Sequence, residues 1–189
     1  LAAAIGGYLT VEAGPLLALL IVAGGLASVL YTSHLTRWML GELVAGITLG
    51  AFVVLGTYYA QAGVLPVHVW LLIVPPGVLT ALLLLLNEFP DAEADRAGGR
   101  RHLVIALGHR GAAWLYTVAV VAVYGFLLAG VVWAWFPRAM LLTLLTTPLA
   151  IKAATTALRH GAEREPMIPA LGANVGLVLA TDLLMAVAY

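Results

Sequence analysis

The sequence contains no cysteine, and charged side chains are scarce in it. Lysine, arginine, aspartate and glutamate together make up only 10% of the 189 residues, and the formal net charge is zero. Without cysteine there is no disulfide, no thiolate nucleophile and no cysteine-ligated metal. Without a surplus of basic residues we expect no nucleic-acid partner. Because a soluble domain carries about a quarter charged residues, the low share also excludes an ordinary soluble domain.

Hydrophobic residues make up 63% of the chain, and the mean hydropathy is +1.05. A helix of about 20 apolar residues crosses a lipid bilayer. The predicted class is therefore an all-α, polytopic membrane bundle of six transmembrane helices and a partial one. Residues 1–9 are apolar but too short to cross, and the first residue is leucine, so we expect the sequence to start inside a helix. The six expected spans are residues 15–31, 41–60, 67–86, 111–135, 137–157 and 169–188.

Basic residues gather in three connections between these spans, namely residues 32–40, 87–110 and 158–168, which lie on one side of the membrane. Because basic loops stay in the cytoplasm, this side is predicted to be cytoplasmic, in the inner or plasma membrane of the cell. The alternation of spans then puts the C-terminal Tyr189 on the outer side. The three connections hold seven of the nine basic residues: Arg37, Arg96, Arg100, Arg101, Arg110, Arg159 and Arg164.

The most highly charged stretch is residues 87–108, which read NEFPDAEADRAGGRRHLVIALG between two apolar runs. Asp91 and Asp95 are four residues apart, and Asn87 lies four residues before Asp91. On a helix that Pro90 can open, the two carboxylates face the same way. Such a pair repels unless a cation lies between the two charges. Mg²⁺ suits it, because this ion takes one or two carboxylates and completes its shell with water and phosphate oxygens.

Arginines follow the two aspartates closely. Arg100 and Arg101 come five and six residues after Asp95, and Gly98 and Gly99 allow the chain to turn in between. Guanidinium groups bind phosphate through paired N–H donors, so these side chains suit the phosphates that the magnesium ion would hold. The alternative interpretation is a solvated loop whose charges pair with one another.

The stretch resembles the second aspartate-rich motif of the UbiA superfamily of membrane prenyltransferases. That motif reads N-x3-D-x3-D, then a basic turn with glycine, then T-L-x-V-x-L-G. Here His102 stands in place of the threonine, and Arg101 stands where lysine is common. The matches together cover most of residues 15–108. Three upstream segments are similar to the naphthoate, or menaquinone, branch: Tyr31-Thr32, residues 41–44 (GELV) and residues 56–63 (GTYYAQAG).

The resemblance implies a single transmembrane domain, residues 1–189, that transfers a polyprenyl group from its diphosphate to an aromatic acceptor with Mg²⁺ as cofactor. The implied acceptor is 1,4-dihydroxy-2-naphthoate, in quinone biosynthesis. The resemblance also implies that Asp91 and Asp95 are catalytic and that Asn87, Asp91 and Asp95 hold the metal. The implied diphosphate-binding residues are Arg37, Arg96, Arg100, Arg101 and Tyr31.

Members of the superfamily have nine helices, and they carry a first aspartate motif, N-D-x2-D-x3-D. This motif does not occur in the sequence. We therefore expect that the domain lacks its N-terminal portion. We also expect the chain as given to bind a prenyl diphosphate weakly without ionising it, because one of the two metal-binding halves is missing.

Two further charged residues lie in the predicted spans and are candidates for a cavity. Glu42 opens the span 41–60, where a carboxylate also suits the positive end of a helix dipole. Lys152 lies in the span 137–157, about 7.5 Å from its cytoplasmic end at the helical rise per residue. Its side chain can point into the cavity, or it can reach along the helix to the interface.

Other functions stay open from the sequence alone. A UbiA-type enzyme with another acceptor, such as 4-hydroxybenzoate, would carry the same motif. A CDP-alcohol phosphotransferase would share only the final D-x3-D. A membrane transporter or a non-catalytic membrane subunit is an alternative of a different class. A second acid cluster facing Asp91 and Asp95 would favour the enzyme.

Overall fold

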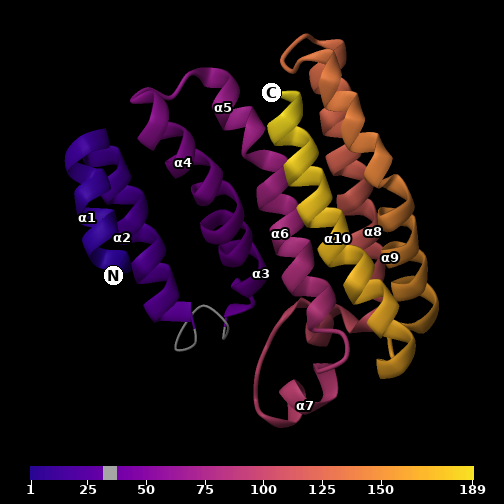
Figure 1. Ribbon diagram of the computed structural model, residues 1–189. Helices are drawn as coiled ribbons and strands as arrows, with labels where there is room; N and C mark the ends of the chain where they lie inside the picture. The colour runs from indigo at the N-terminus through magenta and orange to yellow at the C-terminus, as the bar shows by residue number, and fades with distance from the viewer. Residues whose placement is uncertain (32–37) are drawn as a thin grey trace.

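The computed structural model describes residues 1–31 and 38–189, and within these ranges the regular secondary structure is entirely helical (Figure 1). The all-α prediction is therefore confirmed. The helices are α1 (Ala2–Ala13), α2 (Pro15–Leu30), α3 (Gly41–Ala45), the π-helix η3 (Gly46–Ala51), α4 (Phe52–Ala62), α5 (Val67–Leu72), α6 (Val74–Asn87), α7 (Ala92–Ala97), α8 (Leu103–Val132), the 3₁₀-helix η4 (Arg138–Thr146), α9 (Thr147–His160) and α10 (Arg164–Ala188).

Five helical segments in the described part of the chain are long and apolar enough to cross a membrane: Gly41–Ala62, Val67–Asn87, Leu103–Val132, Arg138–His160 and Arg164–Ala188. They correspond to five of the six expected spans. The sixth expectation, residues 15–31, falls on α2, which is apolar but has only 16 residues. That length is short of the roughly 20 residues that a perpendicular span needs.

Two proline and glycine positions shape the helices that lead to and from the charged stretch. Pro75 and Pro76 lack amide hydrogens, and the helix is interrupted just before them, at Ile73 between α5 and α6. Helix α8 starts at Leu103, eight residues before the expected span at 111. Gly108 interrupts it with φ 70° and ψ 161°, a left-handed backbone region that favours glycine.

Helices α6, α8, α9 and α10 form the tightly packed part of the molecule, and they share one apolar core. Helices α1 and α2 pack on each other and on α4, at the opposite edge of the bundle (Figure 1). Helix α7 lies outside the layer of long helices, in the loop between α6 and α8 (Figure 1). The charged stretch, residues 87–108, therefore comprises the end of α6, the loop that contains α7, and the start of α8.

A stripe of glycines brings η3 against α6. A Cβ atom added to Gly46 would lie 2.5 Å from the Gly77 carbonyl oxygen, and one added to Gly50 would lie 2.6 Å from the Pro76 carbonyl oxygen. Small residues four apart allow this close approach of two membrane helices. Glu42 lies one further step of four residues back along the same stripe. It therefore faces α6 near the place where α6 ends.

Polar side chains join the core helices. The Tyr116 hydroxyl of α8 donates to Asn174 Oδ1 of α10 at 2.8 Å, and Asn174 Nδ2 donates to the Leu82 carbonyl of α6 at 3.3 Å. The Thr146 and Thr181 hydroxyls lie 3.0 Å apart and link η4 to α10. These bonds satisfy polar groups within an apolar bundle, and they hold the helices that carry the charged stretch in a fixed register.

Candidate functional site

The aspartate motif keeps its predicted helical spacing. Helix α6 ends at Asn87, and α7 begins at Ala92 with Asp91 immediately before it. The new helix therefore starts two residues later than Pro90, the position that the sequence favoured. The Asp95 amide donates to the Asp91 carbonyl at 2.8 Å, which puts the two aspartates one helical turn apart.

The two aspartate side chains have different partners. Asp91 is largely exposed, and its carboxylate lies 3.8 Å from the Arg164 guanidinium at the start of α10. Asp95 is mostly buried at 18% side-chain exposure, and it lies 3.3 Å from Arg100 and 3.5 Å from His102. Asp95 thus faces the protein, whereas Asp91 is open to water.

Asn87 and Tyr31 line the same cavity, which has a volume of about 700 Å³. Helices α2, α3 and α6 and the π-helix η3 form its walls. Most of the remaining lining is aliphatic, with Ser28, Thr48 and Thr80 as small polar exceptions. The cavity therefore combines an apolar interior with two of the predicted site residues, both next to helix ends on the side of the charged loop (Figure 1).

The basic residues predicted to belong to the site differ in their exposure and partners. Arg100 has 64% side-chain exposure and pairs with Asp95, and Arg101 is exposed. Arg96 is exposed and its Nη2 lies 3.5 Å from the Ile105 carbonyl oxygen. Arg37 lies outside the described residues. Lys152 is exposed on α9, whose buried face consists of alanines, so its side chain lies away from the core of the bundle.

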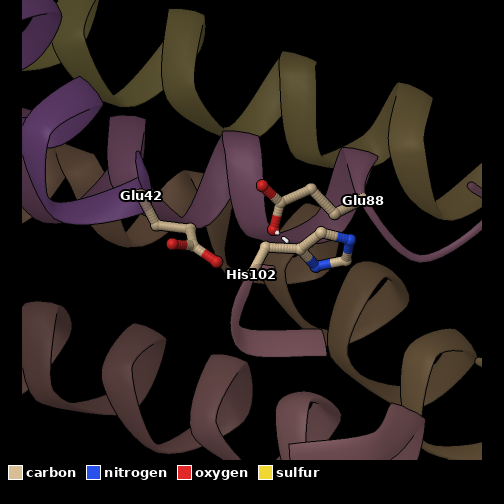
Figure 2. Close-up of side chains that lie close together, drawn as sticks. All are labelled: Glu42, Glu88 and His102. Atoms are coloured by element: carbon tan, nitrogen blue, oxygen red, sulfur yellow. Dashed lines mark ion pairs between the residues drawn. The ribbon is translucent and has the colours of Figure 1, made fainter. Parts of the chain in front are cut away.

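A second cluster of polar side chains lies beside the aspartate motif, and its members are Glu42, Glu88 and His102 (Figure 2). They come from the start of α3, the end of α6 and the residue before α8. Glu42 is 3% exposed, and its Oε1 accepts a hydrogen bond of 2.8 Å from the Leu103 amide. His102 is 6% exposed, and its Nδ1 lies 3.4 Å from Glu88 Oε2.

Burial changes the acidity of this cluster. The pKa of Glu88 is raised to about 9, first because the side chain is buried and then because the Glu42 carboxylate lies next to it. The pKa of His102 is lowered, mainly because burial disfavours the imidazolium. The pKa of Tyr31 is raised by burial and by the nearby acids Glu88 and Glu42. The cluster thus disfavours additional negative charge.

Sequence reasoning did not single out Glu88 or His102 as a site. Glu42 and Glu88 are far apart in the chain, and only the packing of η3 against α6 brings them together. Two signals were present in the sequence. Glu42, Gly46 and Gly50 are spaced by four, and His102 stands where the resembling motif has threonine.

Comparison with known proteins then identifies the chain. A model of the UbiA prenyltransferase family matches residues 1–174. The chain belongs to the UbiA prenyltransferase family. This result confirms the resemblance that the aspartate motif and the upstream segments indicated, and it agrees with the apolar helical bundle.

Curated UbiA-family relatives point to the menaquinone branch. The chain is 30% identical over 138 residues to a 1,4-dihydroxy-2-naphthoate octaprenyltransferase of Bacillus subtilis, a match covering 69% of this chain and 44% of the relative. It is 30% identical over 116 residues to a 2-carboxy-1,4-naphthoquinone phytyltransferase of Synechocystis, a match covering 60% of this chain and 37% of the relative. It is 29% identical over 153 residues to a 1,4-dihydroxy-2-naphthoate octaprenyltransferase of Escherichia coli, a match covering 77% of this chain and 47% of the relative. The chain thus spans less than half the length of these relatives. No solved structure matches it.

Enzymes of the UbiA family use divalent metal, and the donors of the aspartate motif fit Mg²⁺. Asn87, Asp91 and Asp95 offer only oxygen ligands from their side-chain carbonyl and carboxylates. Asn87 and Asp91 are exposed, which leaves room for the waters that Mg²⁺ retains. The partners of the two aspartates are two exposed arginines, Arg100 and Arg164, and for Asp95 also the buried His102.

Proposed function

We propose that this chain forms the diphosphate-binding part of an enzyme that transfers a polyprenyl group to an aromatic acceptor. The observation that carries the proposal is the cavity of about 700 Å³ whose lining includes Asn87 and Tyr31. A prenyl diphosphate has an apolar chain and an anionic head, so it needs an apolar space that opens next to the aspartate motif. The acceptor we propose is 1,4-dihydroxy-2-naphthoate, which the names of two relatives contain.

In the proposed reaction, the bond between the terminal prenyl carbon and the diphosphate oxygen breaks, and its electron pair leaves with the diphosphate. A new carbon–carbon bond forms to the electron-rich ring, and the ring loses one proton. Bound Mg²⁺ would neutralise charge on the departing diphosphate. The residues that would hold it are Asn87, Asp91 and Asp95.

The chain's own side chains have three roles in this proposal. Arg96, Arg100 and Arg101 lie on the charged loop and supply N–H donors to the diphosphate oxygens. Arg37 is proposed for the same role from the sequence. Tyr31 and Asn87 both line the cavity, where we propose that the Tyr31 hydroxyl binds the diphosphate. The aliphatic cavity wall excludes water, which would otherwise capture the allylic cation.

The proposed orientation puts the charged loop, residues 88–102, in the cytoplasm and the C-terminus on the outer side. The support is the excess of arginine in the connections on this side. A prenyl diphosphate is charged at one end and greasy along its length, so it would bind with its head at this membrane surface and its tail between the helices.

The test is prenyl transfer in membranes that contain the protein, with Mg²⁺, a radiolabelled prenyl diphosphate and two acceptors, 1,4-dihydroxy-2-naphthoate and 4-hydroxybenzoate. Because this chain is proposed to be only one part of the enzyme, the assay uses the whole enzyme, and we expect labelled product with the naphthoate. The double variant Asp91→Asn, Asp95→Asn should lower the rate by roughly 100-fold or more, since both metal-binding carboxylates are lost.

Glu93→Gln is the matched control, because Glu93 is an exposed carboxylate on the same short helix and is not part of the motif. It should retain activity. Labelled product from 4-hydroxybenzoate alone would overturn the proposed acceptor. Equal rates for the wild type and the double variant would overturn the proposed site.

A further inference from the structure

The cluster of Glu42, Glu88 and His102 has the geometry of a cation site that is separate from the aspartate motif. One ligand atom from each residue lies within 4.8 Å of the other two. The donors are two carboxylate oxygens and one imidazole nitrogen, supplied by three separate helix ends. Figure 2 shows the Glu88 carboxylate between the Glu42 carboxylate on one side and the His102 ring on the other.

Several buried atoms of this cluster have no hydrogen-bond partner among residues 1–31 and 38–189. They are Glu42 Oε2, Glu88 Oε2 and both ring nitrogens of His102. Glu42 and His102 are each more than nine-tenths buried, at 3% and 6% exposure. Buried polar atoms are normally satisfied, so unsatisfied carboxylate oxygens of Glu42 and Glu88 close to the His102 ring indicate a ligand.

Asp95 orients the imidazole from the other side. Its Oδ2 lies 3.5 Å from His102 Nε2, while His102 Nδ1 lies 3.4 Å from Glu88. A proton on Nε2 facing the Asp95 carboxylate leaves the lone pair of Nδ1 directed at the two glutamates. Histidine ligands in metal sites are commonly held in this way, by a carboxylate on the second ring nitrogen.

The local charge also calls for a cation. Glu42, Glu88 and Asp95 are three acids in a region of low exposure. Among the described residues, Arg100 pairs with one of these acids, Asp95, and its side chain is 64% exposed. Burial of several carboxylates without a matching positive charge is unfavourable, and either a proton or a metal ion has to compensate it.

We propose that Glu42, Glu88 and His102 bind a divalent transition-metal ion, with Zn²⁺ as the best match. Imidazole together with carboxylate suits Zn²⁺, whereas Mg²⁺ prefers oxygen ligands alone and keeps several waters. The ion would tie the start of α3, the end of α6 and the start of α8 to one another. It would thereby anchor the charged loop at both of its ends and hold Asp95 in place through His102.

The test is metal binding by the purified, chelator-treated protein in detergent, measured by isothermal titration calorimetry with Zn²⁺. We expect one equivalent of Zn²⁺ to bind, and a 100-fold excess of Mg²⁺ not to displace it. His102→Thr and Glu42→Gln should each weaken binding by roughly 100-fold. Asp91→Asn should bind Zn²⁺ as the wild type does, because Asp91 belongs only to the aspartate motif.

Circular dichroism shows whether each variant retains its helices. If both variants unfold, X-ray absorption at the zinc edge of the wild type decides the matter, because the proposed shell contains one imidazole. No Zn²⁺ binding by the folded wild type would overturn the proposal. So would unchanged binding in both folded variants, loss of binding in Asp91→Asn, or a zinc shell without imidazole. None of these outcomes depends on prenyl transfer.

Discussion

His102 stands between Glu88 and Asp95, with Nδ1 3.4 Å from one carboxylate and Nε2 3.5 Å from the other. Glu88 follows α6, Asp95 belongs to α7 and His102 precedes α8. The buried ring of His102, the last residue of the charged loop, therefore lies next to Glu88 at the start of the loop and Asp95 in its middle. Asp95 thus has His102 as a buried neighbour, although His102 is not one of the three residues of the N-x3-D-x3-D pattern.

Arg100→Gln tests whether this arginine binds substrate or only pairs with Asp95. The pair is exposed on the arginine side, so its loss should lower the free energy of unfolding by less than about 1 kcal/mol. If Arg100 binds diphosphate, the KM for prenyl diphosphate should rise about 10- to 100-fold, as expected for a lost charge-assisted hydrogen bond. Steady-state kinetics in membranes measure this, with the exposed Arg138→Gln as control. An unchanged KM would remove Arg100 from the substrate site.

Gly46→Ala should destabilise the bundle. The added Cβ would lie 2.5 Å from the Gly77 carbonyl oxygen, so η3 and α6 would have to move apart. Overpacking of this kind costs about 1–3 kcal/mol. Gly172→Ala in α10 is the control, because a Cβ there meets no atom within 4 Å. Thermal unfolding in detergent should show a lower Tm for the first variant only, and equal Tm values would contradict the close helix contact.

Tyr116→Phe and Asn174→Leu test the buried hydrogen bond between α8 and α10. The hydroxyl and the amide oxygen are 2.8 Å apart in the core, so each single variant leaves a polar partner unsatisfied. We expect each to lower the free energy of unfolding by about 1–3 kcal/mol. The double variant should show a coupling of about 0.6–1.7 kcal/mol, the range found within membrane proteins. Strict additivity of the two losses would indicate that the bond contributes nothing.

Gly98→Cys tests the sidedness of the charged loop. The chain has no cysteine, so the introduced thiol is the only one. Gly98 has φ −78°, which any residue adopts, unlike Gly99 at φ 78°. A membrane-impermeant thiol reagent should label this variant in inverted vesicles and not in intact cells. Gln61→Cys, in the last turn of α4 at the far end of the segment Gly41–Ala62, should give the opposite pattern. Labelling of Gly98→Cys in intact cells would reverse the proposed topology.

The sequence predicted the helical class, the one-turn spacing of Asp91 and Asp95, and six spans, five of which are helical segments long enough to cross a membrane. These features depend on local composition and on residues close together in the chain. The start of α8 was placed eight residues late, because Gly108 and the basic residues around it read as loop. The backbone instead breaks at Gly108 alone and is helical on both sides.

The cluster of Glu42, Glu88 and His102 could not be predicted in the same way. Glu42 reaches Glu88 only because Gly46 and Gly50 let η3 approach the backbone of α6. That approach is a tertiary contact between segments far apart in the chain. From the sequence, Glu42 could be described only as a charge at a helix start, and His102 only as a substitution within a motif.

The non-helical backbone at Gly108 divides α8 into a short and a long helical part. The short part before it, residues 103–107, bonds to Glu42 through the Leu103 amide and places Val104, 1% exposed, in the apolar core. The long part after it contributes to the same core. The two parts therefore run in directions that Gly108 sets independently, while a single core fixes both. The end of the charged loop is thus attached to the bundle by apolar packing as well as by the Glu42 hydrogen bond.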